Sequence, residues 1–167
     1  MSRYFDLHVR FDWKNFSSEG YCKVFCPNII AGGNRYDPAR INIAVVSDSG
    51  RPLPPKYDLV SFKGFAVNVD HLALVREKKR AVEVCIAEVK QALLSGRIHQ
   101  ARFFCDALRS YKVPFVFTSG ASTVYEAKSP KEMAFIGELL GFTQREVLLS
   151  ISDTAVEILN EKGYDYA

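Results

Sequence analysis

The stretch Val113-Pro114-Phe115-Val116-Phe117-Thr118 (VPFVFT, residues 113–118) decides the class of fold. Its almost unbroken apolar character is typical of a parallel strand that is buried on both faces of its sheet. An amphipathic helix is expected before it, over residues 98–111, because apolar residues recur there at helical spacing. Ser129 and Pro130 mark the start of another helix after it. Strand and helix therefore alternate, which predicts an α/β fold.

Outward from this stretch, the first part of the sequence is strand-rich and the second part alternates strand and helix. Further strands are expected over residues 4–10, 20–26, 41–46, 57–62, 81–87 and 148–151, and further helices over 72–78, 129–140, from 143 and from 152 to near 163. A complete (β/α)₈ barrel needs about 200 residues or more. We therefore predict one domain over residues 1–167, a contracted and irregular TIM-barrel-like fold with about seven mostly parallel strands.

The composition narrows the class of protein. A hydrophobic fraction of 48% allows a sizeable core, and a charged fraction of 25% is ordinary for a folded chain. No apolar run approaches the roughly 20 residues that span a bilayer, and no apolar signal region follows Met1, so a cytoplasmic protein without a membrane partner is expected. The net charge of +3 permits an RNA partner without requiring one.

The four cysteines predict neither disulfides nor a shared metal. Cys22 and Cys26 would lie roughly 13 Å apart on an extended strand, which is too far for one ion. Together with Cys85 and Cys105 they are expected to be small buried hydrophobes.

Asp6-Leu7-His8, near the end of the first expected strand, resembles the opening motif of metal-dependent phosphoesterases of the polymerase-and-histidinol-phosphatase (PHP) family. That motif needs a second histidine two residues later, where this chain has Arg10. With only His71 and His99 besides His8, a metallohydrolase ligand set cannot be assembled. We therefore expect neither a metal site nor catalytic residues, while the cationic Arg10 could attract a phosphate.

Two further features bear on phosphate binding. Residues 118–122 follow a buried strand, and could either direct amides and hydroxyls toward a phosphate or form an ordinary turn. Basic side chains cluster around residues 76–80 and 90–109, which fits RNA contacts or a solvated face. The exposed Phe103 suggests a protein partner. The candidate RNA-binding residues are Arg10, Arg76, Lys79, Arg80, Arg97, Arg102 and Lys128.

Residues 111–121 (YKVPFVFTSGA) resemble archaeal ribonuclease P protein component 3, the counterpart of the thirty-kilodalton eukaryotic subunit. Ser129-Pro130-Lys131-Glu132, Leu139-Leu140-Gly141, residues 149–152 (LSIS), residues 4–9 (YFDLHV) and residues 81–86 (AVEVCI) agree with it in order and spacing. Two departures stand out. Ala87-Glu88 stands where many relatives carry Arg-Pro, and residues 11–56 are fewer than usual.

The resemblance implies a PHP-like barrel that lacks the metal set and is itself non-catalytic. It implies a subunit of ribonuclease P that binds and positions the catalytic RNA for removal of the 5′ leader of precursor tRNA. The implied partners are ribonuclease P RNA, precursor tRNA and a small subunit of RNA-recognition-motif (RRM) type. The protein would hold no cofactor, and the RNA would use Mg²⁺. A metal-dependent phosphoesterase and a scaffold that recruits only proteins are the alternatives.

Overall fold

The computed structural model describes residues 3–10, 23–31, 35–47 and 50–164. Its strands are β1 (Phe5–Asp6), β2 (Lys23–Val24), β3 (Asn28–Ile30), β4 (Asn42–Val46), β5 (Leu59–Phe62), β6 (Ala81–Cys85) and β7 (Phe115–Thr118). The helices are α1 (Val69–Glu77), α2 (Ile86–Leu94), α3 (Ile98–Ser110), α4 (Pro130–Leu139), α5 (Gln144–Leu149) and α6 (Ala155–Glu161). The π-helical turn η3 (Ser150–Thr154) joins α5 to α6, and η1 (Lys63–Phe65) and η2 (Val124–Glu126) are short 3₁₀ turns.

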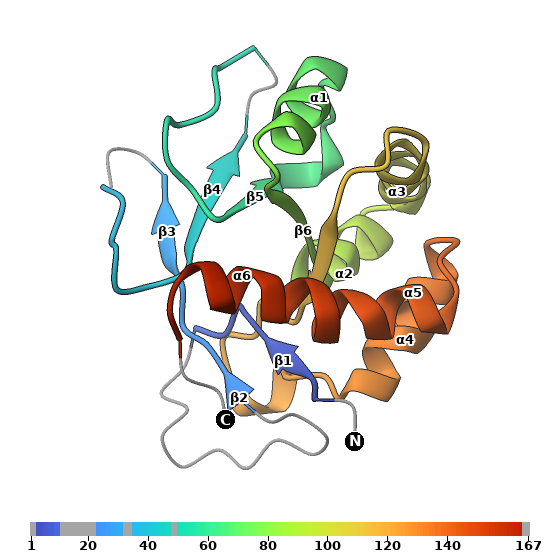
Figure 1. Cartoon of the computed structure of the whole chain (residues 1–167). Coiled ribbons are helices and arrows are strands. Elements are labelled where there is room, and N and C mark those ends of the chain that lie inside the picture. The colour runs from blue at the N-terminus through green and yellow to red at the C-terminus, as the bar shows by residue number, and fades with distance from the viewer. Residues whose placement is uncertain (1–2, 11–22, 32–34, 48–49, 165–167) are drawn as a thin grey trace.

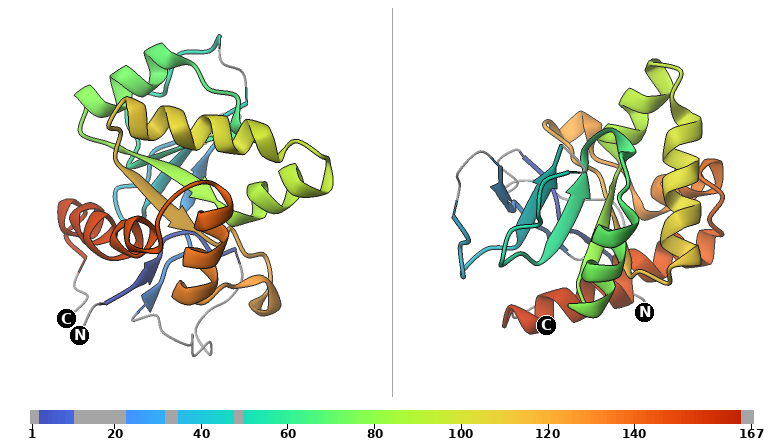
Figure 2. Two further views of the ribbon diagram at one scale, coloured as in Figure 1. Left: turned by 90° about the vertical axis from the view of Figure 1, so that its right-hand side faces the viewer. Right: turned by 90° about the horizontal axis from the view of Figure 1, so that it is seen from above.

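The structure confirms a mixed α/β fold built on a parallel sheet. Five strands pair in the order β3-β4-β5-β6-β7, and every pair is parallel. Helices α1, α2 and α3 lie together on one side of this sheet (Figures 1 and 2). The opposite face of the strands is buried too, against a second apolar cluster that includes α6, and burial on both faces explains why β6 and β7 are mostly apolar.

Strands β1 and β2 form a separate parallel pair in the described part of the chain, so a single sheet of about seven strands is not formed. The pair is nevertheless hydrogen-bonded to the larger sheet. Only Phe25, Cys26 and Pro27 separate β2 from β3, and Val9 forms a parallel bridge with Ala121 just beyond β7. The pairings therefore pass around from β7 through the β1 segment to β2, β3 and β4, which is consistent with a barrel-like arrangement.

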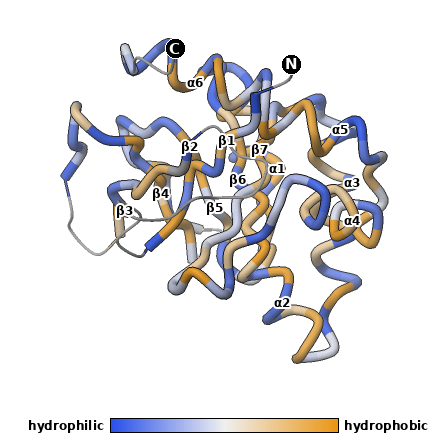
Figure 3. The backbone as a smooth tube through the Cα atoms, turned by 90° about the horizontal axis from the view of Figure 1, so that it is seen from below, coloured by the Kyte–Doolittle hydropathy of each residue, from blue (hydrophilic) through white to orange (hydrophobic). Residues whose placement is uncertain are grey.

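Two apolar clusters hold the fold together. The larger one lies between the sheet and the helices on its outer side, around Phe104, Phe117 and Met133. The smaller one lines the amino-terminal part of the strands with side chains such as Leu59, and α6 adds Ala155, Ile158 and Leu159 to it. Figure 3 shows the apolar segments in orange along the central strands, and Figure 1 shows α6 crossing between the β1–β2 pair and the large sheet.

Several details differ from the sequence-based predictions. The strand predicted over residues 148–151 is wrong, because these residues continue α5 into the π-helical turn. A short apolar run cannot by itself separate a strand from a buried helix segment. Helix α2 and strand β3 were not predicted, and residues 20–22 of the predicted second strand lie outside the described residues. Of the helices in the described residues, none is long and apolar enough to span a membrane.

The start signals of the later helices are confirmed. Ser129 and Glu132 form a capping box at α4, and Thr143 and Glu146 form another at α5. In each box, the hydroxyl accepts from the backbone amide of the glutamate, and the glutamate accepts from the backbone amide of the capping residue. Reciprocal bonds of this kind satisfy amides that the helix leaves free.

Candidate functional site: a buried polar layer with a cationic rim

A polar layer lies directly above the apolar layer inside the barrel-like arrangement. Ser61 and Glu83 are register partners, one pleat further along β5 and β6 than Leu59 and Ala81. Thr118 lies at the end of β7, opposite Cys85 and two residues beyond Val116, the register partner of Glu83. These positions face the carboxyl ends of the strands, where barrel enzymes place their active sites.

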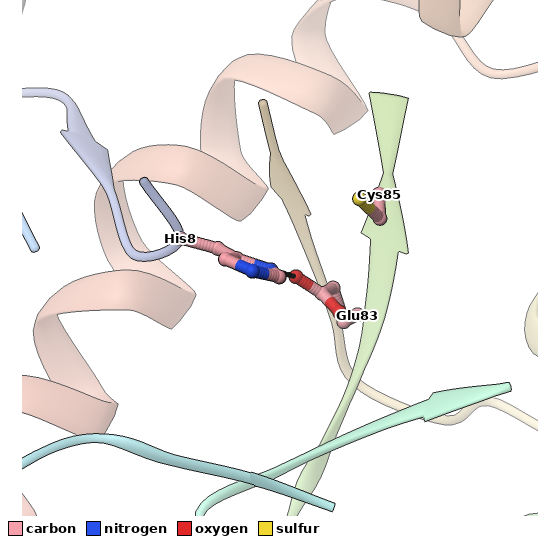
Figure 4. Close-up of side chains that lie close together, drawn as sticks. All are labelled: His8, Glu83 and Cys85. Carbon is pink, nitrogen blue, oxygen red and sulfur yellow. Dashed lines mark hydrogen bonds and ion pairs between the residues drawn. The ribbon is translucent and has the colours of Figure 1, made fainter. Parts of the chain in front are cut away.

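The centre of this layer is a buried pair formed by His8 and Glu83. The His8 Nδ1 and Glu83 Oε1 atoms are 2.5 Å apart, and the two side chains are 2% and 1% exposed (Figure 4). Thr118 donates its hydroxyl to the same oxygen at 2.6 Å. Burial raises the pKa of Glu83, but the charge and hydrogen bond of His8 and the Thr118 bond outweigh it, so the net pKa is lowered. Glu83 is therefore a carboxylate in the folded protein.

Arg10 occupies the other side of the His8 ring. Its Nε donates to His8 Nε2 at 2.9 Å, while Nδ1 faces Glu83. A ring that donates through Nδ1 and accepts through Nε2 has no free position. A metal could therefore reach His8 Nε2 only if the Arg10 side chain moved.

Asp6 fastens the loop after β7 to the first strand. One of its carboxylate oxygens accepts from the backbone amides of His8 and Ser119, both at 3.1 Å. Burial raises the pKa of Asp6 to about 6, although hydrogen bonds from Ser119 and His8 oppose the rise. The Ser119 hydroxyl donates to the His8 carbonyl and accepts from Ala121 N. The polar groups of residues 118–121 thus form hydrogen bonds within the protein. This favours an ordinary turn over a phosphate-binding loop.

His8, Glu83 and Cys85 place one nitrogen, one oxygen and one sulfur within 4.8 Å of one another, and all three are buried. This donor set is of the kind that zinc takes. A metal here would have to displace the thiol proton of Cys85 and the hydrogen bonds that engage both ring nitrogens of His8. Burial and the charge of Glu83 raise the pKa of Cys85 to about 12, so the thiol keeps its proton. Both ring nitrogens of His8 are engaged, and the neighbouring cation is Arg10.

A cavity of about 330 Å³ opens beside this layer. Arg10 and Lys63 bring positive charge to its wall, and Glu83 and Glu88 bring negative charge. The second carboxylate oxygen of Glu83 has no hydrogen-bond partner among the described residues. Sequence reasoning named His8 and Arg10 but missed Glu83 and Cys85. The signal was present, since an acidic residue inside the apolar run 81–86 (AVEVCI) is costly unless it is paired.

The comparisons with known proteins begin with sequence. No family model matches the chain. It is 31% identical over 72 residues to ribonuclease P protein component 3 of Methanococcoides burtonii, covering 41% of this chain and 30% of that protein. It is 30% identical over 101 residues to ribonuclease P protein component 3 of Methanothermobacter thermautotrophicus, covering 57% of this chain and 41% of that protein. The chain is related to ribonuclease P protein component 3.

The sequence similarity to component 3 covers only part of each protein. The matched segments span less than half of either curated relative. In structure, the chain resembles one chain of an archaeal ribonuclease P with mature tRNA, with a TM-score of 0.52 and 18% identity over 65% of this chain and 49% of that one. At this identity the structural likeness concerns the fold alone.

The residues predicted for RNA binding do not form one stripe. The resemblance to component 3 had also implied RNA binding. Arg10 lies at the carboxyl ends of the strands, whereas Arg76 is in the last turn of α1, and Lys79 and Arg80 lie between α1 and the start of β6. Arg97 lies in the α2–α3 turn, where its Nε donates to the Ser95 hydroxyl.

The last two predicted residues stand near α4. Lys128 precedes the helix and contacts the Ala127 carbonyl at 3.5 Å. Arg102 donates to the Leu139 carbonyl at 2.7 Å, and Arg109 donates to the Gly141 carbonyl at 2.7 Å. These two arginines satisfy carbonyl groups at the C-terminal end of α4, which gives Arg102 a structural role. Phe103, on the same helix as both arginines, is 68% exposed as expected.

Proposed function

We propose that the chain is a protein subunit of ribonuclease P that binds and positions the catalytic RNA for removal of the 5′ leader of precursor tRNA. The observation that carries this proposal is the sequence relation to component 3 from two archaea. The structural likeness to a chain of an archaeal ribonuclease P with mature tRNA supports it. In this proposal the fold is a contracted PHP-like barrel of about seven strands, and a small RRM-like subunit is a further partner.

The polar layer supports a subunit that is not itself catalytic. His8, Glu83 and Thr118 bond to one another, Arg10 takes the last ring position, and the Cys85 thiol is protonated. A general base or a nucleophile needs a free lone pair within reach of substrate, and of these groups it is the buried second carboxylate oxygen of Glu83 that lacks a partner among the described residues. The pair therefore stabilises the mouth of the barrel, and Mg²⁺ bound to RNA supplies the chemistry.

Reconstitution tests the proposal. Ribonuclease P RNA, a 5′-labelled precursor tRNA and a small RRM-like subunit would be combined with and without this chain across a Mg²⁺ series. We expect the chain to raise the cleavage rate most at low Mg²⁺, where RNA folding limits activity. Cleavage rates that do not change at any Mg²⁺ concentration would contradict the proposal, and a chain without salt-sensitive RNA affinity would favour a protein scaffold.

A metal-dependent phosphoesterase is the second candidate, because three buried donors lie within 4.8 Å. It predicts that the protein alone hydrolyses a phosphodiester such as bis(4-nitrophenyl) phosphate with Mn²⁺ or Zn²⁺, and that His8→Ala abolishes this. We expect no hydrolysis. We also expect Co²⁺, followed by its visible absorption, to bind Arg10→Ala more tightly than the wild type, since the substitution frees His8 Nε2.

A further inference from the structure

The second feature with ligand-binding character lies at the opposite end of the strands. There the segment after α1 and the segment after α3 lead into the neighbouring strands β6 and β7. Two cavities open at this edge, of about 420 Å³ and about 460 Å³, and Arg80 lines both. Their walls carry Lys56, Arg76, Lys78, Lys79, Arg80 and Lys112, which we call the basic edge.

Most of this positive charge is not neutralised. Arg80 pairs with Glu161. Arg76 donates to the Tyr111 carbonyl at 3.1 Å, and Lys78 lies over the Tyr57 ring. Within the described residues, Lys56, Lys79 and Lys112 form no ion pair, and all three are exposed. The cations of the basic edge therefore remain available to an anionic partner.

The acidic groups nearby do not balance these cations. Asp58 lines the larger cavity, but it is paired with the buried Lys162 at 3.2 Å. Glu161 is paired with Arg80, which leaves Glu157 as the further acidic residue on that wall. Tyr57 lines the smaller cavity and is 3% exposed, and its hydroxyl has no partner among the residues that the structure places. It is a spare hydrogen-bond donor beside the cations.

Two of the three non-glycine residues with positive φ in the described part of the chain stand at this edge, the third being Phe65. Lys79 and Lys112 have φ angles of 53° and 50°, in the left-handed region. Each stands just after a helix, α1 and α3, where the following amides bond back to the last turn: Arg80 N to Val75 O and Val113 N to Leu108 O, both at 3.0 Å. This is the Schellman end, whose left-handed position usually holds glycine.

Three other helices of this chain end in the same way with glycine. Gly96 after α2, Gly141 after α4 and Gly163 after α6 have φ angles of 70°, 88° and 70°. The same backbone bonds follow each of them. Lysine thus replaces glycine at the two helix ends that meet at the basic edge, and strained non-glycine residues tend to persist where function requires the side chain.

We propose that the basic edge binds consecutive phosphates of an RNA backbone. The proposal rests on the proposed function and names the surface that serves it. Two adjoining cavities that share Arg80 suit a chain of anions better than one small anion. Side chains of lysine and arginine that contact phosphates fix the position of RNA without reading its sequence. This surface lies away from the His8–Glu83 layer, so RNA binding here leaves that layer undisturbed.

The test separates charge from fold. Lys79→Gly/Lys112→Gly removes two charges and places glycine where the backbone favours it. The matched control is Lys90→Ala/Lys131→Ala, which removes two exposed lysines from α2 and α4 that form no ion pair with the described residues. Binding to fluorescein-labelled ribonuclease P RNA of Methanothermobacter thermautotrophicus would be followed by anisotropy from about 0.05 to 0.3 M salt, and Tm by circular dichroism.

We expect the Lys79→Gly/Lys112→Gly protein to bind RNA about tenfold or more weakly near 0.1 M salt. The slope of log K against log salt should fall by about 1.4–1.8, since each lost contact contributes roughly 0.7–0.9. Its Tm should be equal to or above that of the wild type, and the control should bind within about twofold of it.

Other outcomes overturn the proposal. If both variants lose affinity equally, the contacts depend on net charge and not on this surface. If Lys79→Gly/Lys112→Gly lowers Tm, the lysines serve the helix ends. If the variant binds RNA and stimulates precursor-tRNA cleavage like the wild type, the basic edge is not the contact, while the proposed function stands.

Discussion

Replacing His8 by leucine is the sharpest test of the structural role of the polar layer. The substitution keeps most of the side-chain volume but leaves the Glu83 carboxylate, whose side chain is 1% exposed, without its hydrogen-bonded histidine partner. The Thr118 hydroxyl then remains bonded to one carboxylate oxygen, with Ser61 nearby. Removing one member of a buried pair costs about 3–5 kcal/mol of unfolding free energy.

That loss corresponds to a fall in Tm on the order of 10 °C, since about 1 kcal/mol shifts a domain of this size by roughly 2–4 °C. The double variant His8→Leu/Glu83→Gln removes the stranded charge and keeps an oxygen for Thr118, so it should recover about half of the loss. Urea unfolding and circular dichroism at pH 7 measure both quantities.

The pH dependence gives an independent check. Without His8, burial is no longer opposed by the interactions of that side chain with the carboxylate, so the pKa of Glu83 rises above that of the unfolded chain. The penalty in His8→Leu should therefore shrink as the pH falls from 7 to 5, when the carboxyl takes up a proton. A loss below about 1 kcal/mol, or a double variant no more stable than the single one, would refute the structural reasoning.

Three further predictions concern other buried groups. Lys162→Met should cost about 3 kcal/mol, because Asp58, whose side chain is 5% exposed, loses its ion-pair partner and keeps only hydrogen bonds from Asn42 and Tyr36, and Lys162→Met/Asp58→Asn should be more stable than the single variant in urea unfolding. For Asp6, the pKa in the folded protein is about 6 against an ordinary value of 3.8, so the folded state holds the proton more tightly and stability falls as pH rises through this window. Asp6→Asn keeps the accepting oxygen and should abolish that fall, with a gain of about 2–3 kcal/mol at pH 7; an unchanged pH profile would contradict the assignment. Gly137→Ala should lose about 1–3 kcal/mol, because its Cβ would lie 2.2 Å from Val147 Cγ2 where α4 meets α5, and adding Val147→Ala should restore part of the Tm.

The basic edge and the polar layer divide the molecule into two ends with different chemistry. At the carboxyl ends of the strands, Arg10 donates a hydrogen bond to His8, and the polar side chains of the site bond to one another. At the amino-terminal ends, α6 packs its apolar residues against the strands, and Lys79 and Lys112 line a cavity beside it. If the proposals hold, RNA contacts the end of the barrel opposite to that used by barrel enzymes.

The sequence by itself determined most of the local structure. The apolar run around Phe115–Thr118, the helix of residues 98–110 and the capping boxes at Ser129 and Thr143 all appear where predicted. These signals depend on neighbours within a few residues, so a single sequence reveals them. The strand predicted for residues 148–151 was wrong because their apolar pattern is too short to show a period. Packing against other elements made these residues helical.

Only the tertiary structure decided which side chains meet. His8 and Glu83 are 75 positions apart, and parallel pairing through β7 brings them within 2.5 Å. The same pairing of β6 with β7 gathers Lys79 and Lys112 at one edge, while Arg97 and Arg102, which looked alike in sequence, stand elsewhere. Charge type is a local property, but proximity in a parallel sheet depends on strand order and register. Strand order and register are fixed by burial across the whole chain, so no single stretch of the sequence could predict the site.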